Sequence, residues 1–291
     1  MFQGSMVALV TPFTNGTIDE EGLGRLVDFH RANGTDMLCP CGTTGESATL
    51  SFDEHHRVVE IVIRAAGGRL PVMAGTGSNS TEEAIELTRH AKRTGADACL
   101  LITPYYNRPT QEGLYLHFKA IAESVDIPLV LYNVPSRTGV NMLPETVERL
   151  SHIHNIVGIK EASGSLAQIS EVVNRCGDDF VVISGDDINT LPLMAVGGKG
   201  VISVTANIAP GEVARMVHAF QAGNFEEAQQ MHHRLLPLNN AMFLQTNPIP
   251  VKTALGLMGI IRSEMRLPLC PMPEELVARL KSILQQYELI Q

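Results

Sequence analysis

The stretch PLVLYNVPSRTGVNMLPETVERLSHIHNIVGIKEAS, residues 128–163, decides the fold. It contains two short apolar runs, PLVLYNVP and IVGIKEAS, separated by a helical pattern in which Pro144 stands at a first helical position. Both runs are continuously apolar rather than alternating, which is typical of parallel strands covered on both faces. The stretch therefore predicts a strand–helix–strand unit of an α/β fold.

The same unit recurs on both sides of this stretch. Ser51 with Glu54 and Ser80 with Glu83 fit capping boxes at helix starts. Eight strands with intervening helices predict a (β/α)₈ TIM barrel. A doubly wound sheet is the alternative, but its glycine fingerprint is only weakly matched by GTG at residues 75–77. The other six apolar runs are MVALVTPF from Met6, MLCPCGTTGE from Met37, LPVMAGTGS from Leu70, ACLLITPYY from Ala98, FVVISGDD from Phe180 and GVISVTAN from Gly200.

The strand pattern stops after Asn207. Helical patterns follow over residues 211–220, 225–243, 248–259 and 273–287. The first of these completes the barrel, and the others form a C-terminal helical appendage packed against it. We therefore predict a catalytic barrel at 1–224 and a helical domain at 225–291.

Composition and charge exclude several classes of protein. Lys plus Arg is 22 and Asp plus Glu is 31, so the net charge of 22 − 31 = −9 argues against a nucleic-acid binder. No apolar run reaches the 18 or so residues of a membrane span, and the N-terminal stretch does not resemble a signal peptide, so we expect a cytoplasmic protein. Five scattered cysteines suggest reduced thiols, and Cys39 and Cys41 are expected to share one face of a strand.

Lys160 is the sharpest chemical signal in the chain. It is one of only six lysines, and it interrupts the apolar run IVGIKEA. One interpretation is a lysine that extends to solvent near a strand end. The other is an inward-pointing amine inside the barrel, where burial disfavours the charged form and the neutral amine can attack a carbonyl to form a Schiff base.

Polar side chains at other strand ends complete a candidate site, because barrel active sites lie at the carboxyl ends of the strands. Tyr132, Tyr106 and Thr43 are hydroxyls that could move the protons of a Schiff-base reaction, although each alone is more often a packing residue. Thr43 and Thr44, with their backbone donors and the flanking Gly42, suit a substrate carboxylate. Arg137 suits a second carboxylate, or is only a surface arginine of its loop. None of the ten histidines follows a strand, which predicts an enzyme without a metal.

Four motifs resemble those of the 4-hydroxy-tetrahydrodipicolinate synthase (dihydrodipicolinate synthase) family, in the pyruvate Schiff-base lyase superfamily. They are GTTGES at 42–47, PYYNRPTQEGLY at 104–115, YNVPSRTG at 132–139 and GIKEASG at 158–164, and the resemblance covers the whole chain. It implies a lyase that needs no cofactor and condenses pyruvate with L-aspartate 4-semialdehyde, the first committed step of lysine and diaminopimelate biosynthesis.

The resemblance also implies the residue roles. Lys160 forms the Schiff base, Tyr132 donates and accepts protons, and Thr43 links Tyr132 to Tyr106 in a proton relay. Pyruvate is held by Thr44 and the main chain at Ile202, with Gly185 lining the site, whereas Arg137 binds the carboxylate of the semialdehyde.

Assembly and regulation follow from the same resemblance. It implies a homotetramer, a dimer of dimers, in which Tyr106 reaches into the neighbouring subunit's site. It also implies allosteric inhibition by L-lysine, although Phe52 stands where sensitive members often carry histidine. The matching lysine-site positions are Ser47, Ala48, His55, Asn79, Glu83 and Tyr105.

Two alternatives remain open at this level. A sister aldolase, such as N-acetylneuraminate lyase or a 2-keto-3-deoxy sugar acid aldolase, would share Lys160 and Tyr132 but is not expected to place Arg137 in its loop. A non-catalytic barrel that binds a metabolite would lack a reactive lysine.

Overall fold

The computed structural model of the protein describes residues 2–291, and its strands form one barrel. Eight parallel strands follow one another in the order β4-β1-β10-β9-β8-β7-β6-β5. A bridge between Leu38 and Val72 joins β4 to the chain just before β5, so the barrel is nearly closed. The predicted fold is confirmed, with strands β1 Gly4–Ala8, β4 Met37–Cys39, β5 Met73–Gly75, β6 Ala98–Ile102, β7 Leu129–Asn133, β8 Ile156–Glu161, β9 Val181–Ser184 and β10 Gly200–Ser203.

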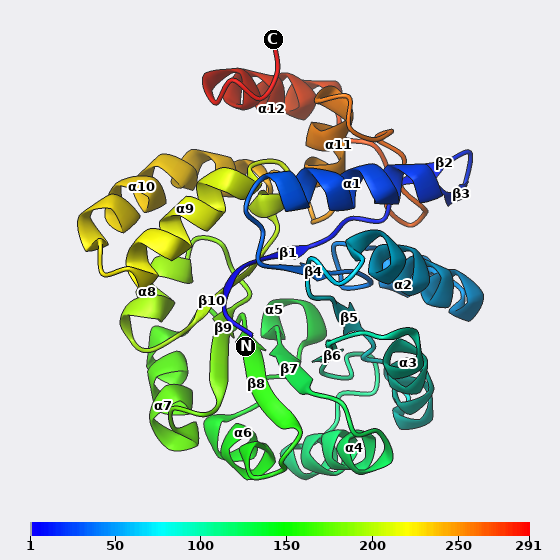
Figure 1. Ribbon diagram of the computed structural model, residues 1–291, viewed down its shortest axis with the longest axis vertical. Coiled ribbons are helices and arrows are strands. Elements are labelled where there is room, and N and C mark those ends of the chain that lie inside the picture. Colours follow the sequence, from blue (N-terminus) through cyan, green and yellow to red (C-terminus); the bar gives the residue numbers. More distant parts are fainter. Residues whose placement is uncertain (1) are drawn as a thin grey trace.

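Helices surround the strands, as Figure 1 shows. Most barrel strands are followed by a helix that returns the chain to the opposite end, as parallel pairing requires. The helices are α1 Glu20–Ala32, α2 Phe52–Ala66, α3 Thr81–Thr94, α4 Gln111–Ser124, α5 Pro135–Thr138, α6 Pro144–Ser151, α7 Leu166–Cys176, α8 Thr190–Ala195, α9 Pro210–Gln221, α10 Phe225–Ala241, α11 Ile249–Leu257 and α12 Glu274–Gln286, with 3₁₀ turns η1 Ser47–Thr49 and η2 Thr205–Asn207.

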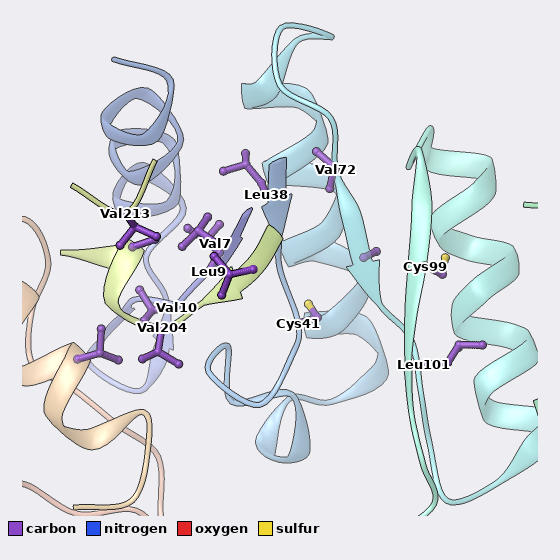
Figure 2. Packing of buried hydrophobic residues seen from close by; sticks show 14 of the residues in the cluster. Val7, Leu9, Val10, Leu38, Cys41, Val72, Cys99, Leu101, Val204 and Val213 are labelled. Carbon is purple, nitrogen blue, oxygen red and sulfur yellow. The ribbon is translucent and has the colours of Figure 1, made fainter. Parts of the chain in front are cut away.

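Strand side chains fill two separate cores. The interior of the barrel contains Met6, Met37 and Ile183, whereas the alternate residues, such as Val7 and Leu38, pack under the helices. Figure 2 shows this outer core, in which side chains of β1, β4 and β6 point away from the barrel interior. Continuous apolar runs are needed because both faces of every strand are buried.

Cys39 and Cys41 do not share a face, so that expectation was wrong. Cys39 belongs to the interior of the barrel and Cys41 to the outer core. Strand β4 ends at Cys39, and Cys41 takes a left-handed backbone with φ 57°. The alternation of a strand therefore no longer applies at Cys41.

Helix starts follow the predicted signals with one difference. Ser51 and Glu54 form the full reciprocal capping box of α2, and Pro144 is the first residue of α6. At α3, Ser80 accepts a hydrogen bond from Glu83 N at 3.4 Å, but the Glu83 carboxylate accepts from Ser78 Oγ instead. This second box is therefore only half formed.

Among the C-terminal helices, α10 packs against α9, and α12 packs against α10 and α11 (Figure 1). Leu235 of α10, Val251 of α11 and Leu280 of α12 belong to the same buried cluster as Val7 of β1. The proposed boundary after residue 224 falls between α9 and α10 and stays a prediction. Among the helices of residues 2–291, none has the length and apolar character needed to cross a membrane.

Candidate active site

Lys160 of β8 points into the barrel. Its neighbour Ile159 packs in the outer core, so alternation along the strand turns Lys160 inward. Lys160 is 5% exposed, and its Nζ lies 4.2 Å from the centroid of the Tyr132 ring. Tyr132 is the register partner of Lys160 across the β7–β8 pairing. The lysine therefore does not extend to solvent, and a phenol lies directly beside its amine.

The neighbouring strand leaves room for this lysine at Gly185. A Cβ added there would lie 2.8 Å from Ala162 Cβ and 3.0 Å from Lys160 Cε. Ile202, the other residue implied on this side, is buried in β10 among the interior side chains. Asp187 accepts hydrogen bonds from the Ser203 hydroxyl and from Val204 N (2.9 Å), and so fixes the chain that follows Ile202.

One cavity of about 490 Å³ opens at the carboxyl ends of the strands. Thr43, Tyr132 and Arg137 are part of its wall, whereas Lys160 is not in the wall and has its Nζ over the ring of Tyr132. The predicted lysine-site positions are all in the same wall, namely Ser47, Ala48, His55, Asn79, Glu83 and Tyr105, with Phe52 beside them. The two sets of predicted residues therefore share one continuous space.

Thr44 is held by a residue that sequence reasoning missed. Its Oγ1 accepts a hydrogen bond of 3.0 Å from Asn247 Nδ2, in the segment before α11. The Asn247 main-chain oxygen accepts from Arg137 NH2 at 3.2 Å, so Asn247 joins the two predicted carboxylate-binding residues. Its own Oδ1 is buried without a hydrogen-bond partner beside the cavity. The only local signal is the Asn-Pro pair, which indicates a turn and not a site.

Arg137 lies in the short helix α5, at the edge of the cavity. It is exposed in this chain, and Gly139, directly after α5, caps the helix in a left-handed conformation. A guanidinium placed 3.2 Å from a main-chain oxygen retains several free donors for a carboxylate. The position fits the predicted role in binding a substrate.

Tyr106 is not brought to Lys160 within this chain. It is 89% exposed and is absent from the cavity wall. Asn79 Oδ1 accepts hydrogen bonds from the main-chain N–H groups of Tyr105 (2.7 Å) and Tyr106 (3.1 Å), which fixes the loop after β6. Within this chain, the structure therefore shows no link from Thr43 to Tyr106.

Burial and hydrogen bonds decide the ionisation of two groups beside the site. Burial raises the pKa of Glu161, whose carboxylate accepts from Ser163 N (2.6 Å) and Asn133 Nδ2 (3.1 Å) on the outer side of the strands. Burial lowers the pKa of His55 to about 4. Since His55 Nε2 lies 2.7 Å from the Gly75 carbonyl, Nε2 carries the proton and the buried Nδ1 is left as an unpaired acceptor.

The sequence predicts that this site holds no metal ion. Within residues 2–291, no group of three or more His, Cys, Asp or Glu side chains is arranged to hold a metal ion. His56 of α2 and His90 of α3 stack at 3.8 Å between ring centroids.

Comparison with known proteins identifies the family. Residues 1–287 match the model of the dihydrodipicolinate synthetase family. The chain belongs to the dihydrodipicolinate synthetase family. A 4-hydroxy-tetrahydrodipicolinate synthase from Citrifermentans bemidjiense is 62% identical to it, over 100% of both chains. The enzyme class predicted from the sequence is therefore confirmed, and neither a sister aldolase nor a non-catalytic barrel is favoured.

Solved structures agree with this family. A chloride-inhibited dihydrodipicolinate synthase from Acinetobacter baumannii, complexed with pyruvate, is 47% identical with a TM-score of 0.98 over 100% of both chains. A dihydrodipicolinate synthase from Cyanidioschyzon merolae with lysine bound is 42% identical with a TM-score of 0.96 over 99% of both chains.

Proposed function

We propose that the protein condenses pyruvate with L-aspartate 4-semialdehyde on Lys160 to give 4-hydroxy-tetrahydrodipicolinate, the first committed step of lysine and diaminopimelate biosynthesis. The observation that carries the proposal is the buried Lys160 amine against the ring of Tyr132, a residue that lines the same cavity as Arg137. Family membership and a pyruvate complex of a relative support it. An acidic chain whose five cysteines are all free suits the cytoplasm.

The chemistry begins at Lys160. Its neutral amine adds to C2 of pyruvate, and loss of water gives a protonated imine. Removal of a C3 proton then gives an enamine. Tyr132 is the phenol beside the amine, and it gives and takes these protons, with Thr43 relaying them to Tyr106 of a neighbouring subunit. Thr44 and the main chain at Ile202 hold the pyruvate carboxylate, and Gly185 leaves space for the adduct.

The second half of the reaction uses Arg137. The enamine attacks the aldehyde carbon and forms the carbon–carbon bond, while Arg137 holds the carboxylate of the semialdehyde. The amine of the semialdehyde then attacks C2 and expels Lys160, which closes the ring. All steps are proton transfers and additions or eliminations, so they require no redox cofactor.

Borohydride trapping tests the proposal. Incubation with pyruvate and borohydride should attach one pyruvyl group, and mass spectrometry should place it on Lys160. An adduct that persists in Lys160→Ala would contradict the assignment. Arg137→Ala should keep the adduct but use the semialdehyde about ten- to a hundredfold less well, since a hydrogen bond to a charged group is worth about 1.5–3 kcal/mol.

We also propose a homotetramer built as a dimer of dimers. The support is Tyr106, which is 89% exposed and lies outside the cavity of its own chain. Activity per chain should fall when dilution dissociates the assembly, as followed by analytical ultracentrifugation beside the assay. Full activity in isolated monomers would exclude a shared site.

L-lysine is the proposed inhibitor, bound in the part of the cavity lined by Ser47, Ala48, His55, Asn79, Glu83 and Tyr105. His55 Nδ1 is a buried acceptor without a partner, and the Glu83 carboxylate lies nearby in the same wall, so both suit an ammonium group. Asn79 uses its Oδ1 on the Tyr105 loop and has its amide N–H groups left for a carboxylate. Calorimetric titration of L-lysine should show binding to wild type and loss in Glu83→Ala, and no binding at millimolar lysine would end this proposal.

A further inference from the structure

A buried ion pair joins the C-terminal appendage to the GTTGES loop, residues 42–47. The Lys252 side chain on α11 is 0% exposed and that of Glu46 is 1% exposed. Lys252 Nζ donates to Glu46 Oε1 and to the Thr11 carbonyl at 2.8 Å, and it lies 4.3 Å from the centroid of the Phe13 ring. Removing two charges from water is costly, and an apolar pair of similar size is often as stable or more so. Stability alone is therefore a poor explanation for this pair.

Glu46 has an unusual backbone in this loop. Its φ of 54° and ψ of 34° are left-handed, a conformation that non-glycine residues rarely adopt and that persists only where the surroundings impose it. Both oxygens of its side chain are bound, since Oε2 accepts from Arg266 N at 3.1 Å while Oε1 accepts from Lys252. Residues of the C-terminal appendage therefore bind the side chain of Glu46, the residue at which the loop adopts its left-handed turn.

The same part of the appendage binds the loop at a second point. Asn247, just before α11, donates to Thr44 Oγ1, two residues from Glu46. Lys252 lies close in space to Asn247, because Lys252 N donates a hydrogen bond of 3.0 Å to the oxygen of Pro248, the residue that follows Asn247. Lys252 also holds Thr11, whose Oγ1 donates to Gly45 O at 2.7 Å. Three successive residues of the loop, Thr44 to Glu46, are therefore fixed through one turn of helix.

We propose that Lys252 is a positioning residue whose ion pair with Glu46 holds the GTTGES loop in the shape that presents Thr44 to pyruvate. This inference rests on the proposed function, because it takes pyruvate as the ligand of Thr44. Without the pair, the left-handed turn at Glu46 relaxes and the Thr44 hydroxyl loses its fixed direction. Binding of pyruvate then suffers more than the later chemical steps, because Lys160 and Tyr132 are on other strands.

The test compares the pyruvate KM and kcat of full-length variants with the pyruvate concentration that gives half-maximal borohydride trapping. Lys252→Met should raise both the KM and the half-trapping concentration at least tenfold, with a smaller change in kcat. Glu46→Gln keeps the side-chain shape, and it should raise the KM about threefold or more. Because both changes break the same contact, the double variant should have about the pyruvate KM of Lys252→Met alone, and not the product of the two single effects.

Leu280→Ala is the matched control for lost stability. Leu280 is a fully buried residue of α12, and its truncation weakens the appendage without touching the loop. It should lower the melting temperature while leaving the pyruvate KM within twofold of wild type. Equal KM values for Lys252→Met and Leu280→Ala at similar melting temperatures would overturn the positioning role.

Other results distinguish a failure of the positioning role of Lys252 from a failure of the proposed function. A Glu46→Gln variant with the wild-type KM overturns the inference, whether or not Lys252→Met folds, and fully multiplicative effects in the double variant do the same. A wild type that captures no pyruvate on Lys160 removes the proposed function instead, and the inference with it.

Discussion

Lys160 and Glu161 show how one strand sorts two ionisable neighbours. Alternation sends Lys160 into the barrel beside Tyr132 and sends Glu161 to the outer side, where Asn133 and Ser163 bind its carboxylate. The register pairs Tyr132 with Lys160 and Asn133 with Glu161, so the outer hydrogen bond joins the two strands directly after the reactive pair. The outer contact therefore joins β7 and β8 one residue beyond the pair Tyr132 and Lys160.

Gly185→Ala should slow the capture of pyruvate. The added Cβ would lie 3.0 Å from Lys160 Cε and 2.8 Å from Ala162 Cβ, so the flexible Lys160 side chain has to shift from its present position beside Tyr132. The backbone of Gly185 is not left-handed, so the change strains the packing and not the chain. We expect borohydride trapping to be about tenfold slower or more, which corresponds to about 1.4 kcal/mol.

Gly24→Ala is the control for that variant. Gly24 lies in α1, and a Cβ added there meets no atom within 4 Å. Its trapping rate should equal that of wild type. If Gly185→Ala also traps pyruvate at the wild-type rate, then Gly185 is not what makes room for Lys160.

At the scale of elements, continuous apolar runs and capping residues allowed all eight barrel strands and the four C-terminal helices to be predicted. The hairpin β2 Phe13–Thr14 and β3 Thr17–Ile18 was missed, because its strands have two residues each and only Phe13 fell within the apolar run from Met6. Its turn is Asn15-Gly16, with φ 53° and 79°, which is a strong hairpin signal when read by itself. The local sequence pattern was therefore sufficient to predict the helices and strands that lie in long apolar or helical stretches.

Ser51→Ala and Ser80→Ala should differ in their effect on stability. Ser51 forms a reciprocal capping box, with Glu54 N donating to Ser51 Oγ and Ser51 N donating to Glu54 Oε2 at 2.9 Å. Ser80 receives only a 3.4 Å hydrogen bond from Glu83 N. We expect Ser51→Ala to lower the free energy of unfolding by about 1 kcal/mol, and Ser80→Ala by less. Urea denaturation measures both, and a larger loss at Ser80 would contradict this ranking.

At the scale of the whole molecule, the site depends on contacts that no local pattern contains. Thr44 and Asn247 are 203 residues apart in the chain, and Glu46 and Lys252 are 206 apart. Motifs pointed to Lys160 and Tyr132 near the ends of their strands, and to Thr44 and Arg137 in the segments that follow a strand. The appendage residues lie on helices whose patterns indicate only packing, so their contact with the loop emerges when the chain folds.

Three buried histidines should make the whole fold sensitive to acid. Burial lowers the pKa of His30 to about 3, and those of His55 and His117 to about 4. All three values lie below the ordinary 6.5, so between pH 6.5 and 4 the unfolded chain takes up protons that the folded chain does not. The contribution of these histidines to the free energy of unfolding should therefore be complete above pH 6.5. It should decrease as the pH drops, by up to about 1.4 kcal/mol per pH unit for each histidine.

His30→Gln isolates one of these contributions. His30 is fully buried and lies outside the cavity wall, and its Nδ1 is 2.9 Å from Thr35 Oγ1. Glutamine cannot be protonated, so the loss of unfolding free energy between pH 7 and pH 5 should shrink by roughly 1–2 kcal/mol, measured by urea denaturation at one protein concentration. His154, whose side chain is 80% exposed, is the control, and His154→Gln should lose as much as wild type. If His30→Gln loses as much stability as His154→Gln over this range, the acid sensitivity has another origin, such as dissociation of the assembly.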